Sequence, residues 1–174
     1  GMAVVIQSLV EAKISGVAYS IHPVTGRDSQ VTINAIRGLG PPLVDGTVAP
    51  DQYIVEMGDD GQPIRVRQHI PGRQTEQLVV TAQGVAHERI STEYQTISSL
   101  SQPQQYEVAR LAKQIERKFH SPVDFEWAFD AEQVWVLQAR PITAVTASSD
   151  LTNDDSEWSR ANFKETMPEV PSPM

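Results

Sequence analysis

The sequence contains no cysteine, no long hydrophobic run and no surplus of basic residues. Without cysteine there are no disulfides or thiolate-bound metals, which agrees with a reducing, cytoplasmic location. The apolar stretch at residues 2–10 is too short for a membrane helix and has no basic lead-in like that of a signal peptide. The formal net charge of −8 argues against nucleic acid or an anionic membrane as a partner, because both need a basic surface.

Several catalytic signatures are also missing from the sequence. The four histidines are scattered without the spacing of zinc ligands, and no serine has the flanking glycines of a nucleophile elbow. The short run Gly38-Leu39-Gly40 lacks the continuation of a dinucleotide or P-loop motif, so we interpret it as a tight turn. These absences exclude the simplest enzyme classes and direct attention to patterns of polar side chains.

Composition indicates one globular domain followed by a tail. The 174 residues are 40% hydrophobic and 21% charged, which is ordinary for a domain with a proper core. From about residue 147 the chain becomes acidic and then rich in proline, as linkers often are. We therefore expect a domain over residues 1–146 and an extended linker over residues 147–174.

Period-two alternation and turn residues predict a chain that is mainly β-structure. The expected strands are residues 3–10, 16–22, 31–36, 51–56, 63–69 and, more weakly, 78–84. The first three are expected to form an antiparallel meander. The fourth and fifth are expected to form a hairpin closed by residues 58–61. Between these two groups, the glycines and prolines of residues 38–46 predict a break in regular structure.

One helix is predicted over residues 104–120, where apolar side chains recur at helical spacing. Its expected apolar stripe consists of Val108, Leu111, Ala112, Ile115 and Phe119. Ser101 and Gln104 have the spacing of a capping box that would start the helix. The predicted fold class is therefore α+β, a mostly antiparallel sheet with one amphipathic helix packed on it.

The stretch from Asp124 to Arg140 is predicted to be a β-hairpin with its chemistry on one face. Antiparallel pairing about Glu132 would set Glu126 opposite Gln138 and Asp124 opposite Arg140. A slip of one residue would bury a carboxylate against aromatic rings, so the pattern favours this register. The apolar residues would then pack together on the other face, namely Phe125, Trp127, Phe129, Trp135, Leu137 and Ala139.

Two interpretations of this polar face remain open on the residues alone. The structural interpretation is a solvated outer face with a cross-strand ion pair between Asp124 and Arg140, and the pattern alone favours it. The functional interpretation is a polyanion site. In that case carboxylate and carboxamide oxygens hold Mg²⁺, phosphates complete the metal's shell, and the guanidinium neutralises the phosphates.

Four collinear segments, residues 3–26, 34–53, 122–143 and 158–168, carry a family resemblance. The third is the most specific, because Asp-Phe-Glu-Trp-Ala and, nine residues later, Leu-Gln-Ala-Arg-Pro agree in both residue types and spacing. Together they resemble the nucleotide-binding domain of the phosphoenolpyruvate synthase / pyruvate phosphate dikinase family, which includes rifampicin phosphotransferases. The resemblance covers nearly the whole chain.

The resemblance implies an ATP-grasp lobe that binds ATP and Mg²⁺. Carried over by position, Glu126 and Gln138 would be metal ligands. Arg140 would bind and stabilise the transferring phosphoryl group, which makes it and Glu126 the candidate catalytic residues. Asp124 would orient Arg140 or the metal shell. Residues 7–10, with Gln7 and Leu9 as the candidate contacts, would supply backbone contacts to adenine.

For a parent protein, the resemblance implies a dikinase-type phosphotransferase. Such an enzyme splits ATP and passes a phosphoryl group through a histidine on a swivelling domain to an acceptor such as pyruvate. The expected partners of this chain are an amino-terminal ATP-grasp lobe and a phosphohistidine domain, both outside residues 1–174. ATP-grasp sites form between two lobes, so we expect this lobe alone to bind Mg-ATP weakly or not at all.

A departure from the family pattern leaves room for a different function. Pro41 and Pro42 follow the Gly-Leu-Gly run, where the family usually has glutamate, so a carboxylate near the site is missing. This supports a rival hypothesis of a non-catalytic nucleotide-sensing or scaffold domain on the same fold. Two further hypotheses are an antibiotic-modifying enzyme of the rifampicin phosphotransferase type and an acidic β-rich interaction module that does not respond to Mg-ATP.

Overall fold

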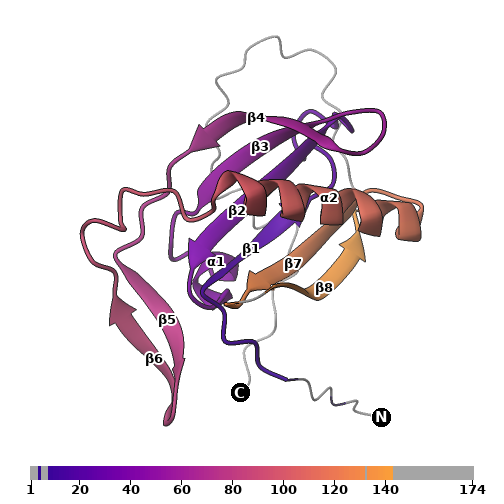
Figure 1. The fold of residues 1–174 in the computed structure, drawn as a ribbon. Coiled ribbons are helices and arrows are strands. Elements are labelled where there is room, and N and C mark those ends of the chain that lie inside the picture. The colour runs from indigo at the N-terminus through magenta and orange to yellow at the C-terminus, as the bar shows by residue number, and fades with distance from the viewer. Residues whose placement is uncertain (1–3, 5–7, 132, 143–174) are drawn as a thin grey trace.

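The computed structural model describes residues 4, 8–131 and 133–142, which form a six-stranded antiparallel sheet, one long helix and a separate two-stranded hairpin (Figure 1). The strand order of the large sheet is β4-β3-β2-β1-β7-β8. The elements are β1 (Ile14–Tyr19), β2 (Gln30–Arg37), α1 (Pro41–Val44), β3 (Asp51–Met57), β4 (Pro63–Ile70), β5 (Glu76–Thr81), β6 (Gly84–Arg89), α2 (Gln102–Phe119), β7 (Val123–Phe129) and β8 (Val134–Pro141).

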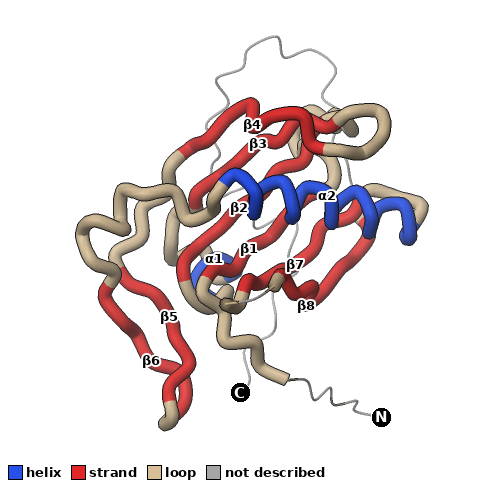
Figure 2. The backbone as a smooth tube through the Cα atoms, viewed as in Figure 1, coloured by secondary structure: helices blue, strands red, loops and turns tan. Residues whose placement is uncertain are grey.

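Helix α2 lies across one face of the large sheet and closes the hydrophobic core (Figure 2). The predicted capping box starts the helix, with the Ser101 backbone N–H donating to Gln104 Oε1 at 2.9 Å. His120, with a φ of 54°, ends it in the left-handed region. The predicted stripe is confirmed except at Phe119, which is 43% exposed. As the last helical residue, Phe119 lies beyond the buried part of the stripe.

The centre of the core is Trp127 of β7, which lies against a glycine of the neighbouring strand. Gly16 is paired with Trp127, and a Cβ atom at position 16 would overlap both the indole ring and the Asn34 carbonyl oxygen. Trp127 is fully buried, as is Phe125 on the same face of β7. Glycine is therefore required in the middle of β1 because the indole occupies the place of its side chain.

Two predictions for the amino-terminal half are corrected. A strand was expected over residues 3–10, but Val4 and residues 8–10 are not in a strand, and residues 3 and 5–7 lie outside the described residues. Strand β1 is paired with β2 on one side and with β7 on the other. A strand formed by the residues before β1 therefore has no edge of β1 left to pair with. A break was expected over residues 38–46, yet α1 begins within it. Its first residues are the two prolines, which suit a first helical turn.

Among the remaining elements, the weak strand expected over residues 78–84 is corrected, because β5 ends at Thr81 and β6 begins at Gly84. Strands β3 and β4 form the expected hairpin, and β5 and β6 form a second hairpin that extends away from the sheet (Figure 1). The second hairpin is tied to the sheet where the Leu39 backbone N–H donates to the Leu78 carbonyl oxygen at 2.9 Å. The predicted linker over residues 147–174 lies outside the described residues.

The predicted α+β class is confirmed: the sheet is antiparallel throughout, and one main helix packs on it. This arrangement agrees with an ATP-grasp-like lobe. Within the described ranges, no helix is long and apolar enough to cross a membrane.

Candidate functional site

The polar side chains of the β7–β8 hairpin lie on the sheet face opposite α2. Glu126 is paired with Gln138 and Asp124 with Arg140, as the alternation predicted. Because successive side chains of a strand alternate between faces, these residues point away from the core that holds Phe125. On the other side of β7, Tyr19 of β1 is paired with Asp124. The sheet thus brings together five polar groups from three strands.

The guanidinium of Arg140 is oriented through one nitrogen only. Its Nε donates to both carboxylate oxygens of Asp124, at 2.7 and 3.0 Å. The Asp124 side chain is 10% exposed and that of Arg140 40% exposed. The bond to Asp124 raises the pKa of Arg140, which therefore stays charged. Its two terminal amino groups form no hydrogen bond with any residue in the described ranges, so they are free to bind a phosphate as a fork.

Glu126 and Gln138 supply two oxygen donors on neighbouring strands. Glu126 is partly buried and Gln138 exposed, and neither has a hydrogen bond or ion pair with another described residue. One carboxylate and one carboxamide fit Mg²⁺, which commonly takes one or two protein ligands and fills its octahedron with water and phosphate oxygens. No cluster of three or more His, Cys, Asp or Glu residues suited to a metal occurs in the described part of the chain. Glu126 and Gln138 by themselves would leave most of a metal's octahedron to other oxygen ligands.

Strand β8 has a β-bulge next to this row, which corrects one part of the predicted hairpin. Glu126 faces Gln138, but Trp127 faces Val136, so Leu137 is an extra residue. The bulge shifts the rest of β8 by one position and reverses its alternation. Trp135 is therefore paired with Ala128, on the polar face, and the prediction that Trp135 and Leu137 pack with the aromatic core was wrong.

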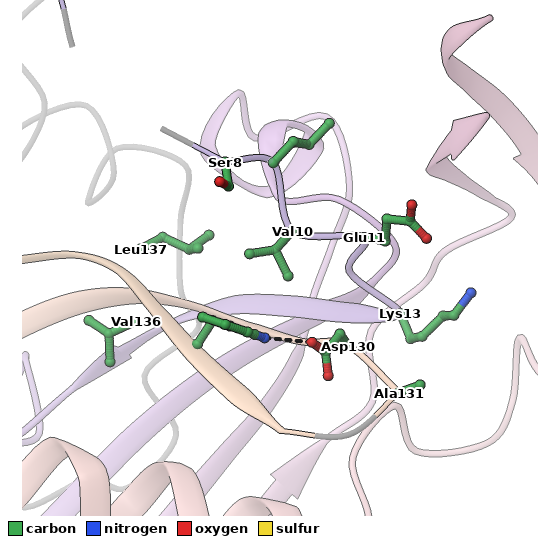
Figure 3. Close-up of a pocket in the computed structure, with 10 residues that line it drawn as sticks. Ser8, Val10, Glu11, Lys13, Asp130, Ala131, Val136 and Leu137 are labelled. Atoms are coloured by element: carbon green, nitrogen blue, oxygen red, sulfur yellow. Dashed lines mark hydrogen bonds between the residues drawn. The ribbon is translucent and has the colours of Figure 1, made fainter. Parts of the chain in front are cut away.

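The bulge builds one wall of a pocket of about 570 Å³ on the polar face (Figure 3). Trp135 is held there by a hydrogen bond from its Nε1 to Asp130 Oδ2, at 2.6 Å. Val10 and Leu137 point toward one another across the pocket in Figure 3. The pocket is lined by Ser8, Leu9, Val10, Glu11, Lys13, Asp130, Ala131, Trp135, Val136 and Leu137.

The structure places the predicted site residues as one neighbourhood, with one exception. Leu9, predicted to contact adenine, lines the pocket and is 63% exposed. Gln7 lies outside the described residues. The pocket adjoins the polar row directly, because Leu137 precedes Gln138 in β8. Sequence reasoning missed Trp135, and no signal in the alternation could have revealed a bulge.

Tyr19 was also missed as a site residue, although it lies within the strand expected over residues 16–22. It alternates with the buried Ala18 and is partly buried beside the ion pair of Asp124 and Arg140. Burial and the negative charge of Asp124 raise the pKa of Tyr19 to about 12, although Arg140 opposes the shift. The phenol therefore stays protonated, and remains a hydrogen-bond donor, at any physiological pH.

An antiparallel lobe that pairs an apolar pocket with an acid, amide and guanidinium row fits the class of nucleotide-binding domains. The family model for the pyruvate phosphate dikinase AMP/ATP-binding domain matches residues 1–160, and the chain belongs to this family.

Relatives named for different activities share this segment. The chain is 32% identical over 167 residues to the phosphoenolpyruvate synthase of Pyrococcus furiosus, covering 90% of this chain and 20% of that protein. It is 33% identical over 144 residues to a rifampicin phosphotransferase of Streptomyces sviceus, covering 83% of this chain and 16% of the relative. It is also 33% identical over 144 residues to an uncharacterized phosphotransferase of Bacillus subtilis, covering 83% and 17%. The chain thus spans a fifth or less of each relative's length.

Proposed function

We propose that this chain is the part of a longer phosphotransferase that holds Mg-ATP for phosphoryl transfer. The observation that carries the proposal is the pairing of Glu126 with Gln138 beside the pairing of Asp124 with Arg140. This register sets two oxygen donors without partners in the described ranges next to a guanidinium whose terminal amino groups are open.

The residues of the polar row and the pocket divide the binding of Mg-ATP among them. Glu126 and Gln138 hold the metal, which neutralises phosphate charge and fixes the phosphate geometry when it is bound. Arg140 binds the phosphoryl group that is transferred, and Asp124 keeps the guanidinium in place through Nε. The nucleoside occupies the apolar pocket, where Leu9 forms part of the wall. Catalysis is then mainly positioning and charge neutralisation.

We further propose that the longer protein transfers phosphate from ATP to a histidine on another domain, and from there to an acceptor. Family membership and the names of the relatives support a phosphotransferase. The acceptor is a separate matter, because a phosphoenolpyruvate synthase and a rifampicin phosphotransferase match this segment about equally well. The acceptor is therefore selected by parts of the protein outside this segment.

Labelling of the longer protein with γ- and β-³²P-ATP tests the proposal. Glu126→Ala is expected to abolish ATP-dependent histidine phosphorylation, because the metal loses its only carboxylate ligand among the proposed donors. Glu107→Ala, on the exposed side of α2, is the matched control and should label like the wild type. Normal labelling of Glu126→Ala would contradict the proposal.

The same experiment separates the rival functions. A nucleotide sensor or scaffold would bind ATP without labelling any histidine, even in the wild type. The support for this rival is that Pro41 and Pro42 stand where the family usually has glutamate. The two prolines also have a structural role, because they start α1. The isolated chain 1–174 is expected to bind Mg-ATP weakly or not at all, which calorimetry can measure. An interaction module would show no response to Mg-ATP in either form.

A further inference from the structure

Tyr19 belongs to a polar row that continues the phosphate side of the proposed site across the sheet. Arg140, Asp124, Tyr19 and Thr32 occupy consecutive paired positions on β8, β7, β1 and β2. Cross-strand partners share a face, so all four side chains lie on the face opposite α2. The row therefore extends two strands beyond the ion pair that the proposed function uses.

Two hydroxyls in this row lack partners. The Tyr19 hydroxyl forms no hydrogen bond with any described residue, although Asp124 and Arg140 are close enough to influence it electrostatically. The neighbouring Thr32 is fully buried, and its Oγ1 has no hydrogen-bond partner in the described part of the chain. By contrast, the next polar pair along β2 is satisfied, because Gln52 Nε2 donates to Asn34 Oδ1 at 3.2 Å.

The two hydroxyls differ in burial, because Thr32 is fully buried whereas Tyr19 is only partly buried. The cost of a buried polar group without a partner, about 1–3 kcal/mol, therefore applies to Thr32, and the Tyr19 hydroxyl remains open to a ligand. Tyr19 is paired with Asp124 across the sheet but does not donate to it, and both Asp124 carboxylate oxygens accept from Arg140 Nε. The phenol is instead a protonated donor beside an open guanidinium fork. Two neighbouring donors of this kind suit a tetrahedral anion, which presents several acceptor oxygens at once.

We propose that the Tyr19 hydroxyl is a second hydrogen-bond donor for the same phosphoryl group that Arg140 binds. This proposal rests on the function proposed above, and it adds a residue from β1 to a site otherwise built by the β7–β8 hairpin. Tyr19 then contacts the ligand directly. Thr32, the next residue in the row, lies behind Tyr19 relative to Arg140 and marks this side of the site as polar.

Calorimetric titration of the longer protein with Mg-ATP tests the proposal through four forms. Tyr19→Phe removes only the hydroxyl and should weaken binding about tenfold, the effect of one hydrogen bond to a charged group. Tyr94→Phe removes a hydroxyl from an exposed tyrosine outside the row and should bind like the wild type. Arg140→Gln tests the underlying site and should weaken binding more than Tyr19→Phe does.

Thermal unfolding without nucleotide distinguishes a ligand contact from a structural one. Because the Tyr19 hydroxyl has no partner in the described ranges, Tyr19→Phe should melt at the wild-type temperature or slightly above it. Wild-type affinity in Tyr19→Phe, together with a loss in Arg140→Gln, would overturn the role of Tyr19 and leave the site intact. Wild-type affinity in both variants, or no ATP binding by the wild type, would overturn the site and Tyr19 with it.

Discussion

Each face of the central sheet carries an aspartate with little exposure, and the two aspartates have different kinds of partner. Asp51 lies on the α2 face and accepts hydrogen bonds from the backbone N–H groups of Gly72 and Ser99, both at 2.7 Å. Asp124 lies on the opposite face and accepts both its bonds from Arg140. The partners of Asp51 are backbone groups fixed by the fold. The partner of Asp124 is a guanidinium whose two terminal amino groups have no partner in the described ranges.

This difference indicates that the α2 face of the sheet contributes mainly to stability and the polar face mainly to function. On the α2 face, the Tyr53 hydroxyl also bonds Asp51 and Ser98, so the polar groups around Asp51 satisfy one another. On the other face, Glu126, Gln138 and the terminal nitrogens of Arg140 have no such partners in the described ranges. Variants of the α2 face should therefore change the free energy of unfolding, and variants of the polar face should change the response to nucleotide.

The largest effect is expected at Trp127. Trp127→Ala should lower the free energy of unfolding by about 3–5 kcal/mol, because it leaves a large cavity in the core. Urea denaturation followed by circular dichroism measures the loss. Trp135→Ala is the matched control, since its indole is exposed at the pocket and should cost much less. Equal losses for the two variants would contradict the division between the faces.

A smaller loss, of about 2 kcal/mol, is expected for Asp51→Asn at neutral pH, because an amide cannot accept both backbone bonds. Burial raises the pKa of Asp51, but the hydrogen bonds from Gly72, Ser99 and Tyr53 outweigh burial and hold its pKa below the ordinary value. The folded state therefore binds the proton less tightly than the unfolded state does. The stability that Asp51 contributes should be complete above about pH 4 and lost as the pH falls through the folded pKa.

Denaturation curves at pH 7 and pH 3 check this sign. The difference between the wild type and Asp51→Asn should shrink at pH 3, where the unfolded carboxyl is already protonated. A difference that grows on acidification would show that Asp51 is not stabilised in its charged form.

The smallest effect is expected at Thr32, and it has the opposite sign. Thr32→Val should leave the free energy of unfolding unchanged or raise it by up to about 1 kcal/mol, because it removes a buried hydroxyl without a partner in the described part of the chain. Ser20→Ala is a useful contrast, since the Ser20 hydroxyl accepts from the Val123 backbone N–H at 2.9 Å and should be needed. A clear loss in Thr32→Val would show that the hydroxyl does have a partner in the fold.

Most of the hairpin chemistry could be predicted from the sequence, because strict alternation fixes which side chains share a face. The pairing of Glu126 with Gln138 followed from that rule alone. The bulge at Leu137 could not be predicted, since one inserted residue leaves the composition of the strand unchanged while reversing its faces. The pocket was missed for the same reason, because its Trp135 wall exists only after the reversal.

The amino-terminal strand shows a different limit of the sequence. Residues 3–10 have the β-branched residues of a strand, but strand formation also needs a free neighbour. β1 pairs on both sides with β2 and β7, and β7 is more than one hundred residues away in the sequence. Local pattern does not reveal which distant strand takes an edge. Order of pairing is thus the part of the fold that the sequence left open.

The magnesium dependence of ATP binding tests the central claim most directly. In the longer protein, the wild type should bind ATP more tightly with Mg²⁺ than with excess EDTA, because Glu126 and Gln138 hold the metal on the polar face. Glu126→Ala should lose most of that gain while keeping its affinity in EDTA and its melting temperature. An undiminished gain in Glu126→Ala would contradict the claim that this face carries the metal.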